Sequence, residues 1–421
     1  MTTATAQRTQ TAQPPNAPFI IWVGLLGLLM VWGAVSGIIV LTIGLAVTGL
    51  TDQVPWGLWI VLDLSAISLG AGAFIFSAIV YLLKLERFRI FARVAVLVGF
   101  LGYTSAMLAL FLDIGRPDRF FYPIIFPNVH SVLWEITMCV VLYFAVLAAE
   151  MAPVVLESRF FSRWPQAAQI GHQIHKATPF LAVVGLGLSL LHQSSLGATY
   201  GVIAARPLWY KPSLPIMFIL SAAAGGIGAT ILGVHVVSYF KGKFVIKKKV
   251  IEQAAIIAGG MLALYLYIKI WDWATTTYYS STAARETDLA LLRLTTPYDT
   301  SFWLVEVLLG GMIPLVIFFW PRLRRNFWWL SLASLLTVVG IVFLRWNVTV
   351  AGLVVPLDWS PGSAFLFPRI FYAPTVPELG AFFGIVAYAL LGYTLAVRFL
   401  PIFEEEEEPP SSMPIDETAP A

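Results

Sequence analysis

Ten apolar segments dominate this chain and constrain its fold more than any other feature. An α-helix needs about 20 predominantly apolar residues to cross the hydrocarbon core of a bilayer. The segments span residues 19–50, 57–83, 92–113, 131–156, 178–200, 214–240, 250–271, 301–320, 327–344 and 379–400. Charged residues make up only 12% of the chain, about half the share of a soluble domain. We therefore predict an all-α integral membrane protein with ten transmembrane helices.

Both ends of the chain differ from this pattern. Residues 1–18 are rich in Thr, Gln and Pro, and residues 401–421 contain a run of glutamates followed by Pro and Ser. Such compositions cannot bury enough apolar surface to fold, so we predict disordered tails. The apolar stretch 19–50 is too long for the core of a signal peptide and has no basic region directly before it, so we predict that it remains a membrane helix.

Lysine and arginine residues predict the orientation of the helices. They concentrate in alternate loops, such as 84–93 and 241–249, which lie on the same side as both termini. Cytoplasmic loops carry an excess of these residues, which predicts that both termini are cytoplasmic. The longest connections, 272–300 and 345–378, then lie on the outer side, where we expect a docking platform for a partner protein.

An internal repeat is present in the apolar segments. The second segment contains Leu64-Ser65-Ala66 and Gly70-x-Gly72-Ala73, and the sixth contains Leu220-Ser221-Ala222 and Gly226-x-Gly228-Ala229. Equivalent helices point the same way, so this pattern predicts two parallel four-helix bundles, 57–200 and 214–344, with peripheral helices at 19–50 and 379–400. The alternative is chance similarity between helices rich in Gly, Ala and Leu.

Ionisable side chains inside membrane segments are costly and mark candidate functional sites. Those in the outer third of the predicted membrane are Asp63, Asp113, His130, Glu135 and His192, together with Trp59, Trp134 and Gln193 beside them. They come from four helices of the first half, which predicts a pocket there. For Asp63 and His192 a purely structural role is the alternative reading.

The second half of the repeat lacks this set. Ile219 stands at the position that matches Asp63. We expect the second half to be mainly structural, with Glu306 as a candidate for proton transfer and with Lys269 reaching to the membrane surface. We also expect structural ion pairs formed by polar residues near the outer side. Their members are Arg116, Asp118, Arg119 and Arg345.

Histidine and cysteine positions argue against bound redox groups. The single cysteine, Cys139, rules out an intramolecular disulfide and a thiolate-held iron–sulfur cluster. His192 and His235 lie about 12 Å and about 31 Å from the outer ends of their segments, so they cannot share a haem iron. His172 and His175 fall in a predicted cytoplasmic loop, and His130 has no partner at its level. The sequence therefore predicts no haem.

Six motifs connect the chain to a known family. They are Pro55-Trp56-Gly57-Leu58-Trp59-Ile60, Asp113-Ile114-Gly115-Arg116-Pro117, Asn128-Val129-His130-Ser131, Leu191-His192-Gln193-Ser194-Ser195-Leu196-Gly197, Pro207-Leu208-Trp209-Tyr210 and Arg345-Trp346-Asn347-Val348. These motifs resemble the NrfD/polysulfide reductase membrane-anchor family, and most closely the ten-helix HybB-type membrane subunits of periplasmic nickel–iron hydrogenases. The resemblance extends from about residue 19 to 400.

This resemblance implies a quinone-reactive subunit in the inner (plasma) membrane of a bacterium or archaeon. Menaquinone or ubiquinone is the exchangeable substrate, and the chain itself holds neither haem nor an iron–sulfur cluster. The implied partners are a ferredoxin-like iron–sulfur subunit outside the cytoplasm and a catalytic subunit, besides the lipid bilayer. No nucleic acid partner is expected.

The resemblance also assigns roles to the polar residues of the first half. In relatives a polar residue at the position of Asp63 lies beside the quinone. We expect Asp63 and His192 to bind the quinone oxygens, together with Gln193 and His130, and Trp59 and Trp134 to form walls of the pocket. The expected proton-transfer groups are Asp63, Asp113, Glu135, His192 and Glu306. Two other function classes stay open, namely a secondary transporter, which also fits repeated membrane helices, and a passive membrane anchor.

Overall fold

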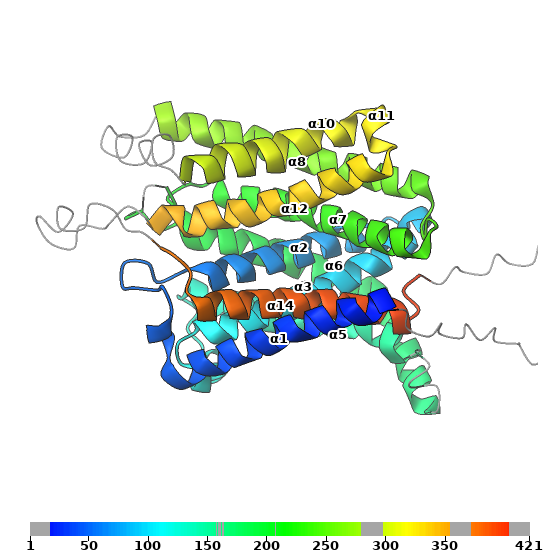
Figure 1. The fold of residues 1–421 in the computed structure, drawn as a ribbon, viewed down its shortest axis with the longest axis horizontal. Coiled ribbons are helices and arrows are strands. Elements are labelled where there is room, and N and C mark those ends of the chain that lie inside the picture. Colours follow the sequence, from blue (N-terminus) through cyan, green and yellow to red (C-terminus); the bar gives the residue numbers. More distant parts are fainter. Residues whose placement is uncertain are drawn as a thin grey trace, which may run out of the picture.

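The computed structural model describes residues 17–403, except 157, 159–160, 162–163, 207, 279–297 and 354–371. Within these residues it contains ten helices that are long and apolar enough to cross a membrane, which confirms the predicted number (Figure 1). The predicted acidic tail beyond residue 403, nearly all of the N-terminal tail and most of the two long outer connections lie outside the described residues.

Ten helical segments form the spans. They are α1 (Ala17–Ile43), α2 (Leu58–Leu82), α3 (Arg89–Asp113), α5 (Val132–Leu156), α6 (Pro165–Gly201), α7 (Leu214–Lys241), α8 (Lys248–Tyr278), the π-helix η4 (Thr300–Met312) continued by α10 (Ile313–Phe319), α12 (Phe327–Thr349) and α14 (Val376–Phe399). Short helical turns connect them. These are η1 (Leu45–Val47), η2 (Glu86–Phe88), η3 (Pro117–Arg119), α4 (Tyr122–Ile125), α11 (Pro321–Arg324) and η5 (Ala351–Leu353).

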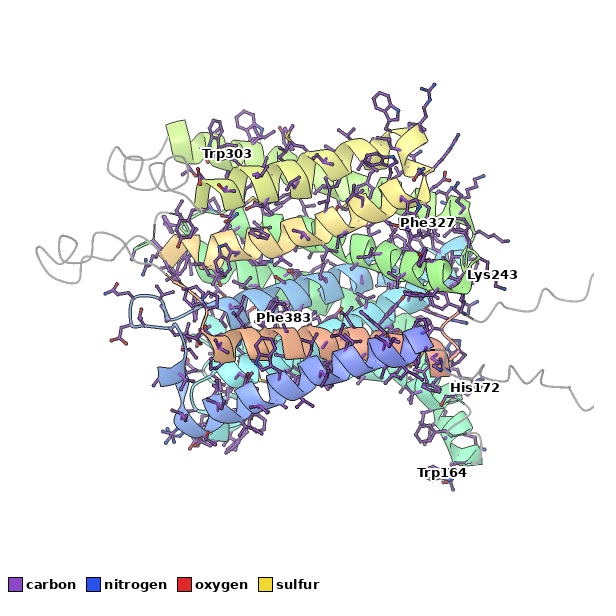
Figure 2. The ribbon with its side chains drawn as sticks, in the orientation of Figure 1. Trp164, His172, Lys243, Trp303, Phe327 and Phe383 are labelled. Carbon is purple, nitrogen blue, oxygen red and sulfur yellow. The ribbon has the colours of Figure 1, made fainter. Side chains whose placement is uncertain are left out.

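Several helix boundaries differ from the sequence prediction, and two of the differences have a clear local cause. The first helix ends at Ile43 rather than at residue 50, because Gly44 adopts a φ of +90° that ends the helix. The fifth span begins at Pro165, since proline is favoured at the first position of a helix. His172 and His175 therefore lie on α6. The prediction that they lie in a loop is wrong. Figure 2 shows His172 on the part of this helix that projects beyond the other spans, with Trp164 just before its first residue.

The helix ends are sorted between two sides. The first residue of α1 and the last residue of α14 lie at the same end of the molecule (Figure 1), as an even number of spans requires. Lys243, Phe327 and His172 also lie at that end, and Trp303 lies at the opposite one (Figure 2). We refer to the end with Trp303 as the outer side. That this side faces away from the cytoplasm stays a prediction from the distribution of Lys and Arg.

Helix α2 is the centre of the bundle. It packs against α3, α6 and α7. In its most apolar stretch of 18 residues 89% is buried, compared with 28% in the corresponding stretch of α1. A helix that is apolar all round is expected to be enclosed by protein or lipid on every face. Helix α1 packs along α14, and α14 contacts α3 and α2 (Figure 1).

The two glycine motifs of the repeat meet where α2 crosses α7. A Cβ atom added to Gly72 would overlap the carbonyl oxygen of Ala222, and one added to Gly226 would overlap the backbone nitrogen of Ala73. Small residues allow such a close backbone approach in membrane helices. The motifs therefore fix the contact between the two halves of the chain. The division into two four-helix bundles stays a prediction.

Candidate functional site

A buried tyrosine–histidine pair lies between α3 and α6. The His192 side chain is fully buried, and its Nδ1 atom is 2.7 Å from the hydroxyl of Tyr103. The Tyr103 ring packs edge-on against Tyr143 at 4.5 Å. His192 Nε2 has no hydrogen-bond partner in the protein. Buried polar atoms in proteins are nearly always hydrogen-bonded, so this nitrogen is suited to a ligand.

The next residue, Gln193, has a similar arrangement. Its Oε1 atom lies 3.5 Å from the hydroxyl of Ser68 on α2, and its Nε2 atom is buried without a partner. Ser68 also accepts two hydrogen bonds from Arg345 of α12, at 2.9 and 2.7 Å. Sequence analysis grouped Arg345 with the outer ion pairs, which is wrong, because its hydrogen bonds go to serine hydroxyls and a backbone carbonyl.

Two carboxyl groups lie on the neighbouring helices. Asp63 of α2 is only 6% exposed, and its Oδ1 atom has no hydrogen-bond partner, like that of Asp113 at the end of α3. The two groups are close enough to interact electrostatically, and Asp63 interacts in the same way with Tyr103. Tyr103 therefore contacts the imidazole of His192 and lies within electrostatic range of Asp63, and no hydrogen bond among the described residues joins Asp63 to His192.

Trp59 lies one helical turn before Asp63 on α2, and its side chain contacts α1 and α14. Its indole nitrogen donates to the backbone oxygen of Glu378, 3.2 Å away, and its ring packs against Val40 and Ala381. Trp59 therefore faces α1 and α14 and does not form the predicted wall beside His192.

Glu378 itself is a buried residue that sequence analysis missed. It accepts hydrogen bonds from the hydroxyl of Tyr372 and from the backbone of Gly49 and Thr375. The signal was present as the spacing Thr375-x-x-Glu378, which forms a capping box at the start of α14.

The residues at the start of α5 are dispersed. His130 is exposed, and the indole of Trp134 donates to the backbone oxygen of Pro123 in α4, 2.7 Å away. The structure does not bring these two side chains to the His192 group. Glu135 accepts a hydrogen bond of 2.7 Å from Ser195, one turn after His192 on α6.

The second half contains a polar cluster of its own. Glu306 on the π-helix η4 is 2% exposed and lies 2.6 Å from Lys269 Nζ. Tyr265 and Asn347 also donate to its carboxylate, at 2.7 and 2.5 Å, and Asn347 accepts from Ser301 at 2.6 Å. The expectation that Lys269 reaches the membrane surface is wrong, because its ammonium group is buried in this ion pair.

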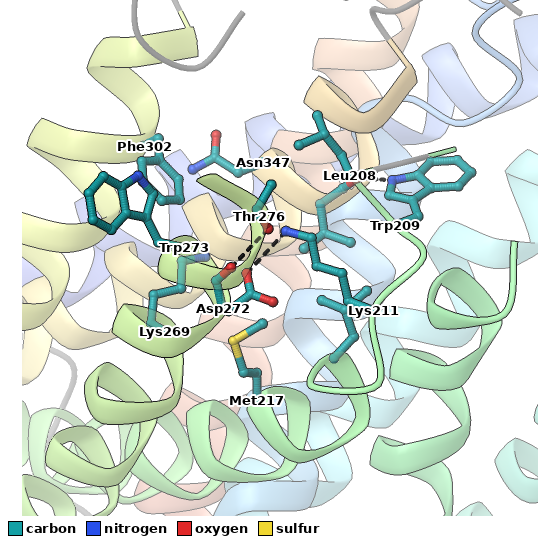
Figure 3. A pocket seen from close by; sticks show the side chains of 12 residues that line it. Leu208, Trp209, Lys211, Met217, Lys269, Asp272, Trp273, Thr276, Phe302 and Asn347 are labelled. Atoms are coloured by element: carbon teal, nitrogen blue, oxygen red, sulfur yellow. Dashed lines mark hydrogen bonds and ion pairs between the residues drawn. The ribbon is translucent and has the colours of Figure 1, made fainter. Parts of the chain in front are cut away.

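A small cavity opens beside the Glu306 cluster (Figure 3). Its volume is about 50 Å³, and aromatic residues and charged side chains line it, among them Trp209, Trp273 and Phe302. Asp272 accepts from Lys211 at 3.1 Å and from Ser213 at 2.5 Å. The charges around the cavity are therefore paired, unlike the polar atoms near His192.

The predicted outer ion pairs involve Arg116, Asp118 and Arg119. Arg116 lies 3.0 Å from Asp118 and Arg119 lies 3.9 Å from it, and all three are largely exposed. The hydrogen bond from Arg116 lowers the pKa of Asp118 below its usual value.

His235 lies on α7, and its partners differ from those of His192. Its Nδ1 atom is 2.7 Å from the Ser331 hydroxyl, and its ring stacks on Phe327 at 4.5 Å. Among the described residues, no group of three or more His, Cys, Asp and Glu side chains is arranged to hold a metal ion.

The fold and the buried polar groups define a ten-helix integral membrane protein with hydrogen-bonding atoms available deep in the bundle. A family model described as "Polysulphide reductase, NrfD" matches residues 46–356. The chain belongs to the NrfD family.

Relatives extend this match over nearly the whole chain. The integral membrane subunit of menaquinone reductase from Nitratidesulfovibrio vulgaris is 34% identical over 93% of this chain and 93% of its own length. The probable Ni/Fe-hydrogenase 2 b-type cytochrome subunit of Escherichia coli is 28% identical over 85% and 86%. The integral membrane subunit of an Hdr-like menaquinol oxidoreductase from Archaeoglobus fulgidus is 24% identical over 86% and 88%.

Proposed function

We propose that the chain is the quinone-reactive membrane subunit of a respiratory oxidoreductase complex. It exchanges electrons between an iron–sulfur subunit on the outer side and the quinone pool of the bilayer. The names of two relatives refer to menaquinone or menaquinol, which supports quinone as the substrate. The match covers most of both chains, which supports the same place in a complex of several subunits.

One observation carries this proposal, namely the group of buried polar atoms without partners around Tyr103 and His192. If the Tyr103 hydroxyl donates to Nδ1 of His192, the proton of the neutral ring is on Nε2. This nitrogen and Nε2 of Gln193 are then two donors for a quinone oxygen. The apolar helices around them suit a hydrophobic ring, since ligand pockets combine apolar walls with a few polar groups.

Quinone reduction needs protons as well as hydrogen-bond donors. Two electrons and two protons convert a quinone into a hydroquinone, and a positioned acid or imidazole accelerates proton transfer. Asp63 and Asp113 are carboxyl groups with unpartnered oxygen atoms on the same side of the bundle. We assign proton exchange with the substrate to Asp63 and His192, with Asp113 and Glu135 as relay groups. Glu306 belongs to a separate cluster, and a role for it in proton transfer across the membrane is part of this proposal.

The test uses the full-length chain in lipid nanodiscs and the complex purified from its host. Binding of menaquinone-4 is measured with protein-free discs as the reference, and quinone-linked turnover is measured in the complex. His192→Ala is expected to weaken binding about tenfold, because a hydrogen bond is lost. Asp63→Asn is expected to lower turnover about 100-fold and to leave binding nearly unchanged, because it removes a proton donor.

Asp118→Asn is the matched control, since it removes an exposed carboxyl group on the same side of the protein. It is expected to change neither binding nor turnover. Normal binding and turnover in both His192→Ala and Asp63→Asn would show that the proposed pocket is wrong, whereas a wild-type chain that does not bind menaquinone-4 would favour a passive anchor. Transport of a solute by the chain without its partners would favour a secondary transporter.

A further inference from the structure

We propose that Arg345, from the second half of the chain, completes the quinone site by binding the negatively charged oxygen of the reduced substrate. This inference rests on the proposed function and adds a cation from the opposite side of the junction between the halves. The site would then be built by both halves of the repeat and not by the first half alone.

The position of Arg345 links it to the residues around His192. Its guanidinium group is fully buried and lies 3.6 Å above the ring of Phe218 on α7. Two of its nitrogens donate to Ser68 on α2, whose hydroxyl lies 3.5 Å from Gln193. The Ser68 side chain therefore lies between Arg345 and Gln193, whose amide nitrogen has no partner.

One nitrogen of this guanidinium group remains available. Nη1 of Arg345 is buried without a hydrogen-bond partner, as are Nε2 of Gln193 and Nε2 of His192. Arginine carries five N–H donors and stays protonated in proteins, so this unpartnered nitrogen is a donor with a positive charge. Together the three nitrogens give the region two neutral donors and one cationic donor, which is the chemistry that an oxyanion requires.

The charge of Arg345 is not balanced by a carboxylate in contact with it. Across the described residues, its hydrogen bonds go to Ser68, Ser221 and the carbonyl of Phe218. Two other buried cations have such a partner, since Lys269 pairs with Glu306 and Lys211 with Asp272. Glu306 acts on this charge through space and not through a contact. A buried cation without a contacting anion is costly, and an anionic ligand would relieve that cost.

The chemistry of quinone reduction supplies the anion. When an electron from the iron–sulfur partner reaches the quinone before a proton does, an oxygen of the ring carries negative charge. The cation of Arg345 stabilises that oxygen until an acid transfers its proton, and the neutral hydroquinone then has less attraction for the site. The same group thus favours reduction and permits release.

The experiment compares two naphthoquinones of similar size with different charge. The 2-hydroxy-1,4-naphthoquinone is an anion at neutral pH, and 2-methyl-1,4-naphthoquinone is neutral. Their affinities are measured for the full-length chain in nanodiscs, in the wild type and in Arg345→Met and Arg345→Lys. Arg345→Met is expected to weaken binding of the anion about tenfold or more, because a charge-assisted hydrogen bond is lost. The same substitution is expected to weaken binding of the neutral probe less than about threefold. Arg345→Lys keeps the charge and is expected to retain most of the preference for the anion.

Two further variants keep the test decisive. Arg345→Gln has an N–H donor without a charge and is used if the Met variant is unstable, with the same expected loss for the anion. Ser68 and Ser221 each donate to a backbone carbonyl in addition, so neither hydroxyl is left without a partner when Arg345 is replaced.

Arg206→Met is the matched control, because Arg206 is a buried arginine that donates to carbonyls of η5. It is expected to leave the ratio of the two affinities unchanged.

The outcomes separate the two proposals. The role of Arg345 is overturned if Arg345→Met weakens the affinity for both probes equally. It is also overturned if Arg206→Met removes the preference for the anion as well. In both cases the proposed quinone binding stands. A wild-type chain that binds neither probe overturns the proposed function and this inference together.

Discussion

The Glu306 cluster in the second half of the chain and the His192 group in the first half differ in how their buried polar atoms are satisfied. In the second half, Glu306 has hydrogen bonds or an ion pair from three side chains, and Lys269 is one of them. In the first half, Asp63, His192 and Gln193 each retain a buried polar atom without a partner in the protein. The number of buried ionisable groups is therefore a poor guide to function, because both halves contain them.

The difference lies in whether the protein itself satisfies those groups. A buried polar network that is fully satisfied rigidifies the helices that contribute to it. Polar atoms without partners destabilise the protein unless a ligand or water binds them, so natural proteins retain them mainly where they have a role. By this criterion we assign the Glu306 cluster to stabilisation of the fold and propose that the His192 group binds the substrate.

The largest expected effect tests the crossing that joins the halves. Gly72→Leu adds a side chain where even a Cβ atom would overlap the backbone of Ala222. The backbone cannot give way easily, so we expect a loss of more than about 4 kcal/mol and little folded protein. Gly24→Leu is the control, because a Cβ atom at Gly24 meets no atom within 4 Å. Thermal unfolding in detergent measures both. A stable Gly72→Leu variant would mean that α2 and α7 do not cross as described.

The second prediction breaks the satisfied cluster of the second half. Glu306→Gln removes the only carboxylate that pairs with Lys269 among the described residues. Loss of one partner of a buried ion pair destabilises proteins by about 3–5 kcal/mol, because the other charge is left uncompensated. We expect a stability loss of this size with naphthoquinone binding unchanged. The double variant Glu306→Gln with Lys269→Met should recover part of the loss, and a loss in quinone binding would contradict the separation of the two clusters.

The third prediction concerns stability in the first half. Asp63→Asn keeps the shape of the side chain, and Oδ1 of Asp63 has no hydrogen bond to lose. We expect the free energy of unfolding without quinone to change by less than about 1 kcal/mol, although turnover falls strongly. Denaturation of the quinone-free chain, with Glu306→Gln measured in parallel, provides the comparison. Equal destabilisation by the two substitutions would mean that Asp63 is a structural residue like Glu306.

Much of the fold was predictable from the sequence. Ten apolar segments of sufficient length and the two glycine motifs indicate the spans and the crossing at Gly72 and Gly226, because hydrophobic length and close backbone approach are local properties. The start of α6 at Pro165 was missed, since the polar residues of its first turns resemble a loop.

The site was predictable only in part. Ionisable side chains are rare in apolar segments, which indicated that Asp63, His192 and Glu306 are important. It could not indicate their partners, because Tyr103 and Lys269 reach them from other helices. Cationic residues are common at membrane surfaces, so Lys269 was predicted to lie there, which is wrong. The partner of Trp134 in α4 was not predicted either. Pairing between helices depends on their rotation and register, which a single sequence does not encode in any local pattern.

The smallest expected effect is at the outer ion pair of Arg116 and Asp118. The hydrogen bond from Arg116 lowers the pKa of Asp118, so any stabilisation is present above the usual aspartate pKa of about 3.9 and is lost as the pH falls below it. Both side chains are more than half exposed, and exposed pairs contribute little because water and salt screen them. Asp118→Asn is therefore expected to leave the melting temperature unchanged between pH 5 and pH 8, in 0.05 M and in 0.5 M salt. A decrease comparable with that of Glu306→Gln would mean that the exposed outer segment, and not the buried clusters, stabilises this end of the bundle.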